Sequence, residues 1–133
     1  MSNREDLGKL LLRVTLAVIV LFHGIFKLTH GVAWIEQPLA AFGLPGFLAY
    51  GTYVAEVVAP LLIAVGYRAR LAALVIGFDM LMAIVLVLRT QIFRTSERSG
   101  AWGIEVEAMI LLVSLAVFCL GSGRYRLGGG RWD

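Results

Sequence analysis

The stretch GFLAYGTYVAEVVAPLLIAVGYRARLAALVIGFDMLMAIVLVL, residues 46–88, decides the fold. It contains two apolar runs, 46–65 and 71–88, which are joined by only a short turn at residues 66–70. A helix of about 20 residues, rising 1.5 Å per residue, crosses a hydrocarbon core about 30 Å thick. The two runs therefore predict an antiparallel pair of transmembrane helices with Arg68 and Arg70 in the turn.

Two further apolar runs, 7–27 and 102–120, flank this pair. The chain has 133 residues, of which 59% are hydrophobic and 16% are charged, whereas soluble domains have about 45–50% apolar and about 25% charged residues. Lipid offers the backbone no hydrogen-bond partner, so each run is expected to be helical. We predict an all-α integral membrane protein, an antiparallel four-helix bundle forming a single transmembrane domain over residues 1–133.

Residues 29–45, between the first two runs, mix aromatic, polar and turn-forming residues, including Trp34, Glu36 and Pro38. Aromatic and polar side chains gather at the level of the lipid head groups. We therefore expect a short interfacial helix or re-entrant turn in this segment.

Basic residues set the expected orientation, because positive charge near a span favours the cytoplasm. They gather near both termini and in the middle turn, at Arg4, Lys9, Arg68, Arg70, Arg124, Arg126 and Arg131. This predicts a bacterial or archaeal inner-membrane protein with both termini cytoplasmic, although the loop 89–100 on the other side also carries arginines. The net charge of +3 is spread beside apolar runs and not along one polar face, so no nucleic-acid partner is expected.

Ionisable residues inside the apolar runs are the candidate functional residues. Each costs about 2.5–3.5 kcal/mol on insertion scales, so such residues tend to be paired or to line a cavity. Arg13, His23 and Lys27 share one face of the first run, within an arc of about 80° at 100° per residue. Glu56 and Asp79 lie about halfway along the second and third runs, and we expect Arg13 to pair with one of them.

A second group is expected at the outer mouth of the bundle. His23 and Lys27 lie in the outer half of the first run, and Glu105 and Glu107 lie at the outer end of the fourth. Residues 105 and 107 are about 200° apart on a helix, so only one of them can face the interior.

Tyr53 and Glu56 share one face of the second run, so the tyrosine hydroxyl is a candidate to bond the carboxylate or a ligand. No metal or heme is predicted, because His30 is the only histidine besides His23 and Lys27 would repel a cation. The single cysteine, Cys119, leaves no cysteine pair for redox chemistry.

The charges inside the bilayer have two interpretations at this point. They are either structural pairs that fix how the helices pack, or the lining of a small polar cavity that binds a quinone-like or other amphipathic molecule or passes protons. The pattern of residue types fits both.

Three stretches of the sequence resemble the DoxX family of small membrane proteins. LLR at residues 11–13 followed by HGIFKL at 23–28 resembles the family's opening LLR…HGxxKL signature. EVVAPLLIAVGYRARLAA at 56–73 is similar to its middle stretch, and GIE at 103–105 with GSGRYRL at 121–127 is similar to its closing motif.

Positions that recur in the family are occupied here by Arg13, His23, Gly24, Lys27, Glu56, Arg70 and Glu105. The resemblance therefore favours Glu105 over Glu107 as the residue that faces the interior. The chain departs from the pattern where Pro60 replaces the usual glycine and Arg126 replaces a serine, and Asp79 is not part of the pattern.

The resemblance implies a redox setting, since the family is linked with a quinone oxidoreductase and with oxidative or quinone stress. We expect a quinone-linked component of a membrane oxidoreductase, in which Lys27 and His23 contact quinone oxygens and Glu105 or Glu56 moves protons. We expect the chain to act with a redox partner protein or as a homo-oligomer, and the electrons would come from the partner. Two alternatives stay open: a non-catalytic subunit that anchors or assembles a partner, and a small transporter coupled to protons through Glu56 or Asp79.

Overall fold

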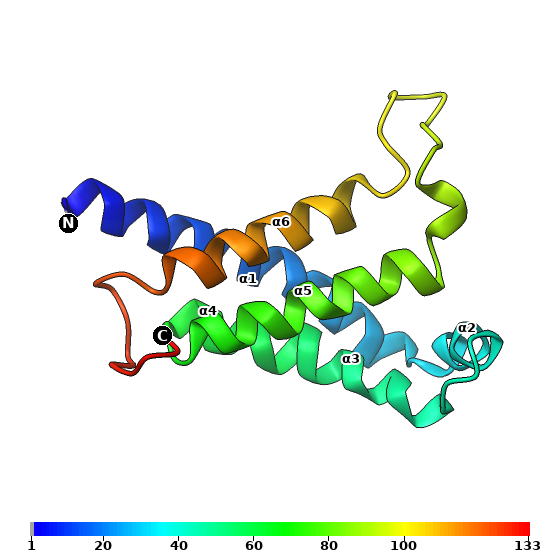
Figure 1. The fold of residues 1–133 in the computed structure, drawn as a ribbon, viewed down its shortest axis with the longest axis horizontal. Coiled ribbons are helices and arrows are strands. Elements are labelled where there is room, and N and C mark those ends of the chain that lie inside the picture. Colours follow the sequence, from blue (N-terminus) through cyan, green and yellow to red (C-terminus); the bar gives the residue numbers. More distant parts are fainter. Residues whose placement is uncertain (1) are drawn as a thin grey trace.

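The computed structural model describes residues 2–133, and most of them are helical (Figure 1). In chain order the helices are α1 (Asn3–His30), η1 (Ala33–Ile35), α2 (Glu36–Ala41), η2 (Gly46–Tyr50), α3 (Gly51–Tyr53), η3 (Val54–Val58), α4 (Ala59–Val65), α5 (Ala69–Leu86), η4 (Arg89–Gln91) and α6 (Glu105–Leu120). Within residues 2–133 the only strand-like pairing is an isolated bridge between Thr95 and Trp102. The predicted all-α membrane bundle is confirmed.

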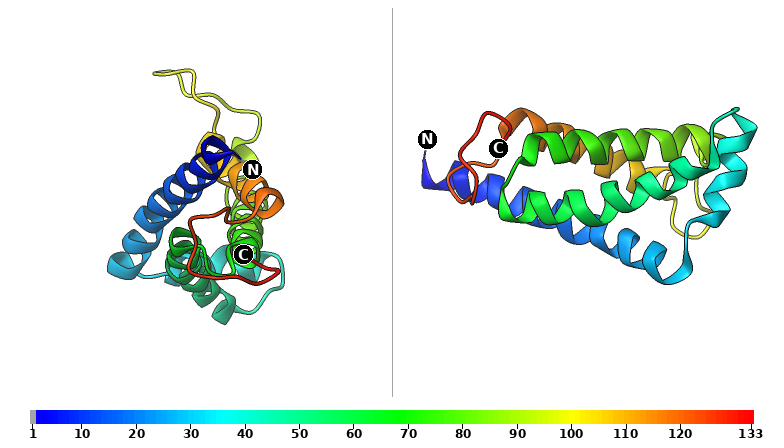
Figure 2. Two further views of the ribbon diagram at one scale, coloured as in Figure 1. Left: turned by 90° about the vertical axis from the view of Figure 1, so that its left-hand side faces the viewer. Right: turned by 90° about the horizontal axis from the view of Figure 1, so that it is seen from below.

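Four helical segments run alternately up and down, so both ends of the chain lie at the same end of the bundle (Figure 1). We call this end the basic end, and we call the opposite end, where α2 and η4 lie, the far end. Neighbours pack in a ring: α1 contacts α4 and α6, and α5 contacts α4 and α6, as the end view in Figure 2 shows.

Three helical segments in the described part of the chain are long and apolar enough to cross a membrane: Asn3–His30, Gly46–Val65 and Ala69–Leu86. α6 is also apolar, but it has 16 residues where a span needs about 20. A fourth span over 102–120 therefore stays a prediction.

The surface of the bundle is as apolar as its interior, which is the property of a protein surrounded by lipid. Phe22 is 71% exposed and Leu112 is 65% exposed. The interior instead uses small residues, which let helix backbones approach closely where no hydrophobic force drives them together. The central cluster includes Ala17, Ala59, Ala69, Ala72 and Ala73.

The second helical segment is irregular at η3, which is a turn of π-helix over Val54–Val58. Pro60 has no N–H, so the carbonyl of Glu56 one turn earlier has no α-helical partner. The backbone accommodates this with a wider turn, in which the N–H of Ala59 donates to the carbonyl of Val54. Turns of this kind are frequent at functional sites, and this one presents Glu56 toward the interior.

At the far end, η1 and α2 form the short helical segment that the sequence predicts between the first two runs. Its apolar residues Val32, Ile35 and Leu39 pack together with Ala49. The segment therefore covers the far end of the bundle with apolar side chains.

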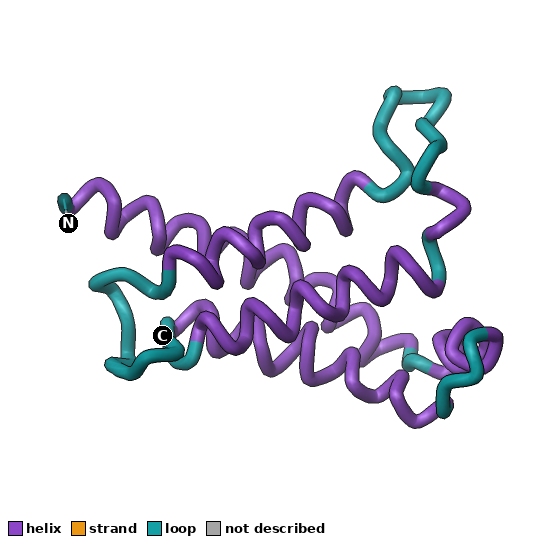
Figure 3. Tube along the Cα trace, in the orientation of Figure 1, coloured by secondary structure: helices purple, strands orange, loops and turns teal. Residues whose placement is uncertain are grey.

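At the basic end, residues 121–133 form a loop that folds back across the turn between α4 and α5 (Figure 3). The N–H of Leu127 donates to the carbonyl of Val65 at 2.9 Å, and the N–H of Arg70 donates to the carbonyl of Trp132 at 2.9 Å. This C-terminal loop closes the basic end through main-chain hydrogen bonds.

Candidate functional site

An ion pair joins two helical segments inside the bundle. The ammonium of Lys27 in α1 donates to Oε1 of Glu56 in η3. The Glu56 side chain is 2% exposed and that of Lys27 is 14% exposed. Such a pair is costly in an apolar interior unless its geometry is good and its remaining polar atoms are satisfied.

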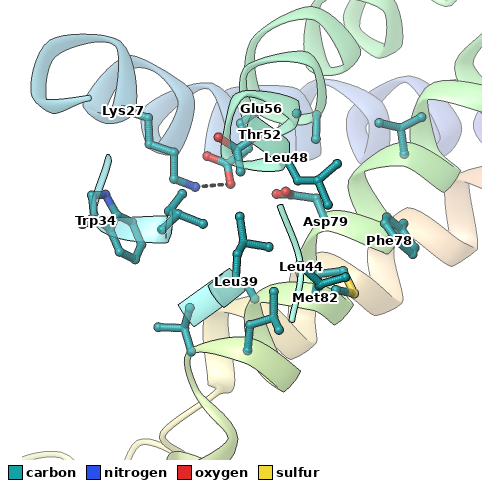
Figure 4. Close-up of a pocket in the computed structure, with 17 residues that line it drawn as sticks. Lys27, Trp34, Leu39, Leu44, Leu48, Thr52, Glu56, Phe78, Asp79 and Met82 are labelled. Atoms are coloured by element: carbon teal, nitrogen blue, oxygen red, sulfur yellow. Dashed lines mark hydrogen bonds and ion pairs between the residues drawn. The ribbon is translucent and has the colours of Figure 1, made fainter. Parts of the chain in front are cut away.

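A cavity of about 440 Å³ adjoins this pair (Figure 4). Three ionisable side chains line it, those of Lys27, Glu56 and Asp79. Most of the remaining lining is apolar and comes from residues 34–48, which we call the far-end segment, and from α5. It includes Trp34, Leu39, Leu44, Leu48, Phe78, Met82 and Leu86. Such a cavity, apolar with a few convergent polar groups, has the character of a small-molecule site.

The carboxyl groups of Glu56 and Asp79 lie next to one another on the cavity wall and interact (Figure 4). Within residues 2–133, Oε2 of Glu56 and Oδ2 of Asp79 are buried without a hydrogen-bond partner. Lys27 supplies one positive charge to two carboxyl groups. A ligand with a hydroxyl or another donor would find these two oxygens in the cavity wall.

A second cavity, of about 380 Å³, also adjoins this pair. Lys27, Glu56 and Trp34 line both cavities. His23 and Glu107 line the second cavity only. The ion pair thus lines both an apolar cavity and a cavity that holds two further titratable groups.

Close packing between α1 and η3 positions the pair. A Cβ added at Gly24 would overlap the carbonyl oxygen of Glu56, so only glycine allows this approach. The hydroxyl of Tyr53 donates to the carbonyl of Lys27 at 3.2 Å, which ties α1 to the same segment. The hydroxyl of Tyr53 therefore bonds the main chain of α1 and not the Glu56 carboxylate, and a bond from it to a ligand stays a prediction.

The prediction that Arg13 pairs with Glu56 or Asp79 was wrong. Its guanidinium is fully buried and donates to the carbonyl of Ile63 at 3.1 Å and to that of Tyr125. The reason is distance, since Arg13 and Lys27 are about 21 Å apart along α1 at 1.5 Å per residue. Arg13 therefore belongs to the basic end and Glu56 to the far end.

The structure places Glu107, and not Glu105, on the interior side of α6. Glu105 is the first residue of α6 and is exposed. Glu107 is half-buried and lies in line with the buried residues Ile104 and Ile110, one turn on either side. That i, i+3 pattern of buried residues was readable in the sequence, and it identifies the interior face of α6 correctly.

Sequence reasoning found Lys27, Glu56 and Asp79 as separate candidates, but it missed the ion pair between the first two. It also missed the apolar wall that Trp34 and Leu39 contribute from the far-end segment. The wide turn before Pro60 shifts the register of Glu56, and helix periodicity does not predict such a turn.

The family model described as DoxX matches residues 8–89, a range that includes the three ionisable residues of the larger cavity. A protein of Bacillus subtilis (strain 168) named "Putative oxidoreductase CatD" is 27% identical over 122 residues, which are 92% of this chain and 85% of that protein. No solved structure gives a significant match.

Proposed function

We propose that this chain, which belongs to the DoxX family, is a quinone-linked redox component of a bacterial or archaeal inner membrane. The observation that carries the proposal is the larger cavity, which is apolar along most of its wall and has Lys27, Glu56 and Asp79 together at one place. The name of the Bacillus subtilis relative, an oxidoreductase, supports a redox role. A redox partner protein would exchange the electrons.

The lining residues fit a quinone-type ligand. A head group with two oxygens needs donors in its oxidised form and acceptors in its reduced form. Lys27 can donate to a carbonyl oxygen, and the unpartnered Glu56 and Asp79 oxygens can accept from hydroxyls. The apolar wall suits the ring and its substituents, and the volume of about 440 Å³ lies in the range of about 300–1,000 Å³ typical of ligand pockets.

A bound quinone would supply two-electron, two-proton chemistry, and the protein groups would handle the protons. Glu56 and Asp79 line the cavity, where they would accept or return the hydroxyl protons of the bound ligand. Lys27 holds Glu56 in place and contacts both cavities. His23 and Glu107, in the second cavity, are positioned to pass protons between the Lys27–Glu56 pair and the outside, a role that suits a histidine near neutral pH.

The proposed orientation places the basic end in the cytoplasm. Most of the basic residues of the chain lie near its termini and in the turn between α4 and α5, all at the same end of the bundle (Figure 1). The two cavities then lie in the outer half of the membrane.

Trp34 provides a direct test, because it lines both cavities. The protein with Trp102→Phe and Trp132→Phe, reconstituted in nanodiscs, retains Trp34 as its sole tryptophan. Titration with a short-chain quinone should quench its fluorescence with saturation. Glu56→Gln should weaken binding about ten-fold, because a charge-assisted hydrogen bond contributes about 1.5–3 kcal/mol.

Glu105→Gln is the matched control, because it makes the same chemical change at an exposed residue outside both cavities. It should leave the quenching curve unchanged. Quenching that rises linearly and equally in all variants would mean partition of the quinone into lipid. That result would leave the anchoring subunit as the better account.

A further inference from the structure

The basic end holds a third cavity, of about 520 Å³, which none of the roles above uses. Four cationic side chains from three separate segments line it: Lys9 from α1, Arg70 from α5, and Arg124 and Arg126 from the C-terminal loop. Asp6 and Asp133 are the two acidic residues in its wall. With all six charged, the lining has a net charge of +2.

Both carboxylates of this cavity are already satisfied by main-chain donors. Asp133 accepts from the N–H groups of Arg68 and Gly130, and Asp6 accepts from the N–H of Arg124 at 3.0 Å. The donors to Asp133 hold the pKa of its carboxyl below the ordinary value. These carboxylates hold the loop through main-chain donors, and the four cationic side chains outnumber them in the lining of the cavity.

Arg70 is held by main-chain acceptors and still has donors for a ligand. Arg70 uses Nη1 for the carbonyl of Phe118 at 3.1 Å and Nε for the main-chain oxygen of Asp133 at 3.2 Å, which fixes the plane of its guanidinium. An arginine has five N–H donors, so others stay available. Arg126 is exposed at the rim. An anion entering the cavity would meet donors from several directions.

The neighbours of these residues place the cavity at the membrane surface. Tyr125, Leu127 and Trp132 alternate in the chain with the charged residues of the loop, and they are 46%, 80% and 46% exposed. Exposed tyrosine and tryptophan side chains mark the head-group level of a bilayer. Leu120 lines the cavity itself and is 47% exposed on the lipid-facing side of α6.

We propose that this cavity binds the phosphate group of an anionic phospholipid, with the acyl chains lying along exposed leucines such as Leu120. A basic pocket between transmembrane helices at the membrane surface is the kind of site that acidic lipid head groups occupy. The arginines supply the planar, multiply donating groups that suit phosphate oxygens. The bound lipid would connect α1, α5 and the C-terminal loop, independently of any ligand at the far end.

The test measures lipid retained by the intact protein. Wild type is transferred into mild detergent with equal amounts of phosphatidylglycerol and phosphatidylcholine, and bound lipid is counted by native mass spectrometry. We expect one phosphatidylglycerol per chain. Arg124→Gln combined with Arg126→Gln should weaken its retention about 30-fold, at about 1 kcal/mol per arginine.

Arg94→Gln combined with Arg98→Gln is the matched control, because it removes the same charge from the exposed loop at the far end. It should change retention less than about two-fold. Equal loss in both double variants, or equal retention of the two lipids by wild type, would overturn the proposal. If the first double variant does not fold, Arg126→Gln alone replaces it, because this side chain is exposed.

A second experiment distinguishes binding of the lipid from binding of free phosphate. Inorganic phosphate at the same concentration as the lipid should leave phosphatidylglycerol bound, because it lacks the contacts of the acyl chains. Displacement at equal concentration would show that the cavity selects phosphate alone, and it would overturn the assignment to a lipid.

Discussion

The two ends of the bundle hold their charged side chains in different ways. At the basic end, charged groups bond mainly to the main chain: Arg13 donates to two carbonyls, and Asp133 accepts from two N–H groups. At the far end, Lys27 and Glu56 bond to one another. Among the described residues, one oxygen each of Glu56 and Asp79 there is buried without a partner, and so is Nε of Arg13 at the basic end.

This difference distinguishes charged residues that hold the fold from charged residues that are candidates for ligand binding. A charge whose bonds to main-chain atoms fix two segments together stabilises a turn or closes a loop. A charge that is bonded to another side chain, beside a cavity and with acceptor atoms to spare, can exchange its partner for a ligand or a proton. The proposed function therefore rests on the Lys27–Glu56 pair, and we expect structural roles for Arg13 and Asp133.

The largest loss of stability is expected from a substitution at the basic end. Arg13→Met removes the donor to Ile63 and Tyr125, and it leaves these carbonyls without that hydrogen bond. Since each unsatisfied buried polar group costs about 1–3 kcal/mol, we expect a loss of about 3 kcal/mol in the free energy of unfolding. Unfolding in mixed micelles measures it. A change below about 0.5 kcal/mol, the size of a typical surface substitution, would show that Arg13 has no structural role.

The next largest loss of stability is expected where α1 approaches η3 closely. Gly24→Ala places a Cβ on the carbonyl of Glu56, so we expect a loss of about 1–3 kcal/mol from overpacking. Gly8→Ala in the same helix is the control, since nothing lies within 4 Å of its added Cβ. It should stabilise α1 by about 0.5–1 kcal/mol. If the two variants unfold alike, the contact does not hold the site.

A smaller loss of stability is expected at the far end. Glu56→Gln keeps the shape of the side chain but replaces the ion pair by a hydrogen bond from the Lys27 ammonium to a neutral amide oxygen, which should cost about 1–2 kcal/mol. Glu105→Gln should stay within about 0.5 kcal/mol of wild type, because that side chain is exposed. A Glu56→Gln loss as large as that of Arg13→Met would mean that the pair is chiefly structural.

The smallest effect depends on pH and is confined to the C-terminal loop. The pKa of Asp133 is held below its ordinary value of 3.8 by the N–H groups of Gly130 and Arg68. A lowered folded-state pKa means that the carboxylate stabilises the loop above pH about 4 and that this contribution is lost as pH falls through the lowered pKa. Hydrogen exchange of residues 121–133 should therefore rise only in that acidic range.

Asp133→Asn should raise exchange of the same loop at neutral pH and leave α1 and α5 unchanged. Exchange that is independent of both pH and this substitution would contradict the role given to Asp133.

The helical architecture and the family were predictable from the sequence, because apolar runs of span length have few alternatives in lipid. The DoxX resemblance that motifs such as HGIFKL indicated is confirmed by the family match over residues 8–89. The three ionisable residues of the larger cavity were predictable for the same reason: a charge inside an apolar run is conspicuous.

The partners of the buried charged residues were not predictable. Pairing depends on how deep each residue lies in the bundle and on which way its helical turn points it. Pro60 widens the turn around Glu56, and a loop far away in the sequence supplies Tyr125 to Arg13. Family resemblance also misled the choice at α6, where it favoured Glu105 although the buried pattern of Ile104 and Ile110 marks Glu107. Local periodicity was the better guide there.

The central claim is that quinone binding resides in the far-end pair and not in the charges at the basic end. The direct measurement extracts protein purified from native membranes in mild detergent and quantifies bound quinone by chromatography, for wild type, Glu56→Gln and Arg13→Lys. We predict close to one quinone per chain in wild type and in folded Arg13→Lys, and little in folded Glu56→Gln. Absence of quinone from stable wild-type protein, or equal loss in both variants, would contradict the claim.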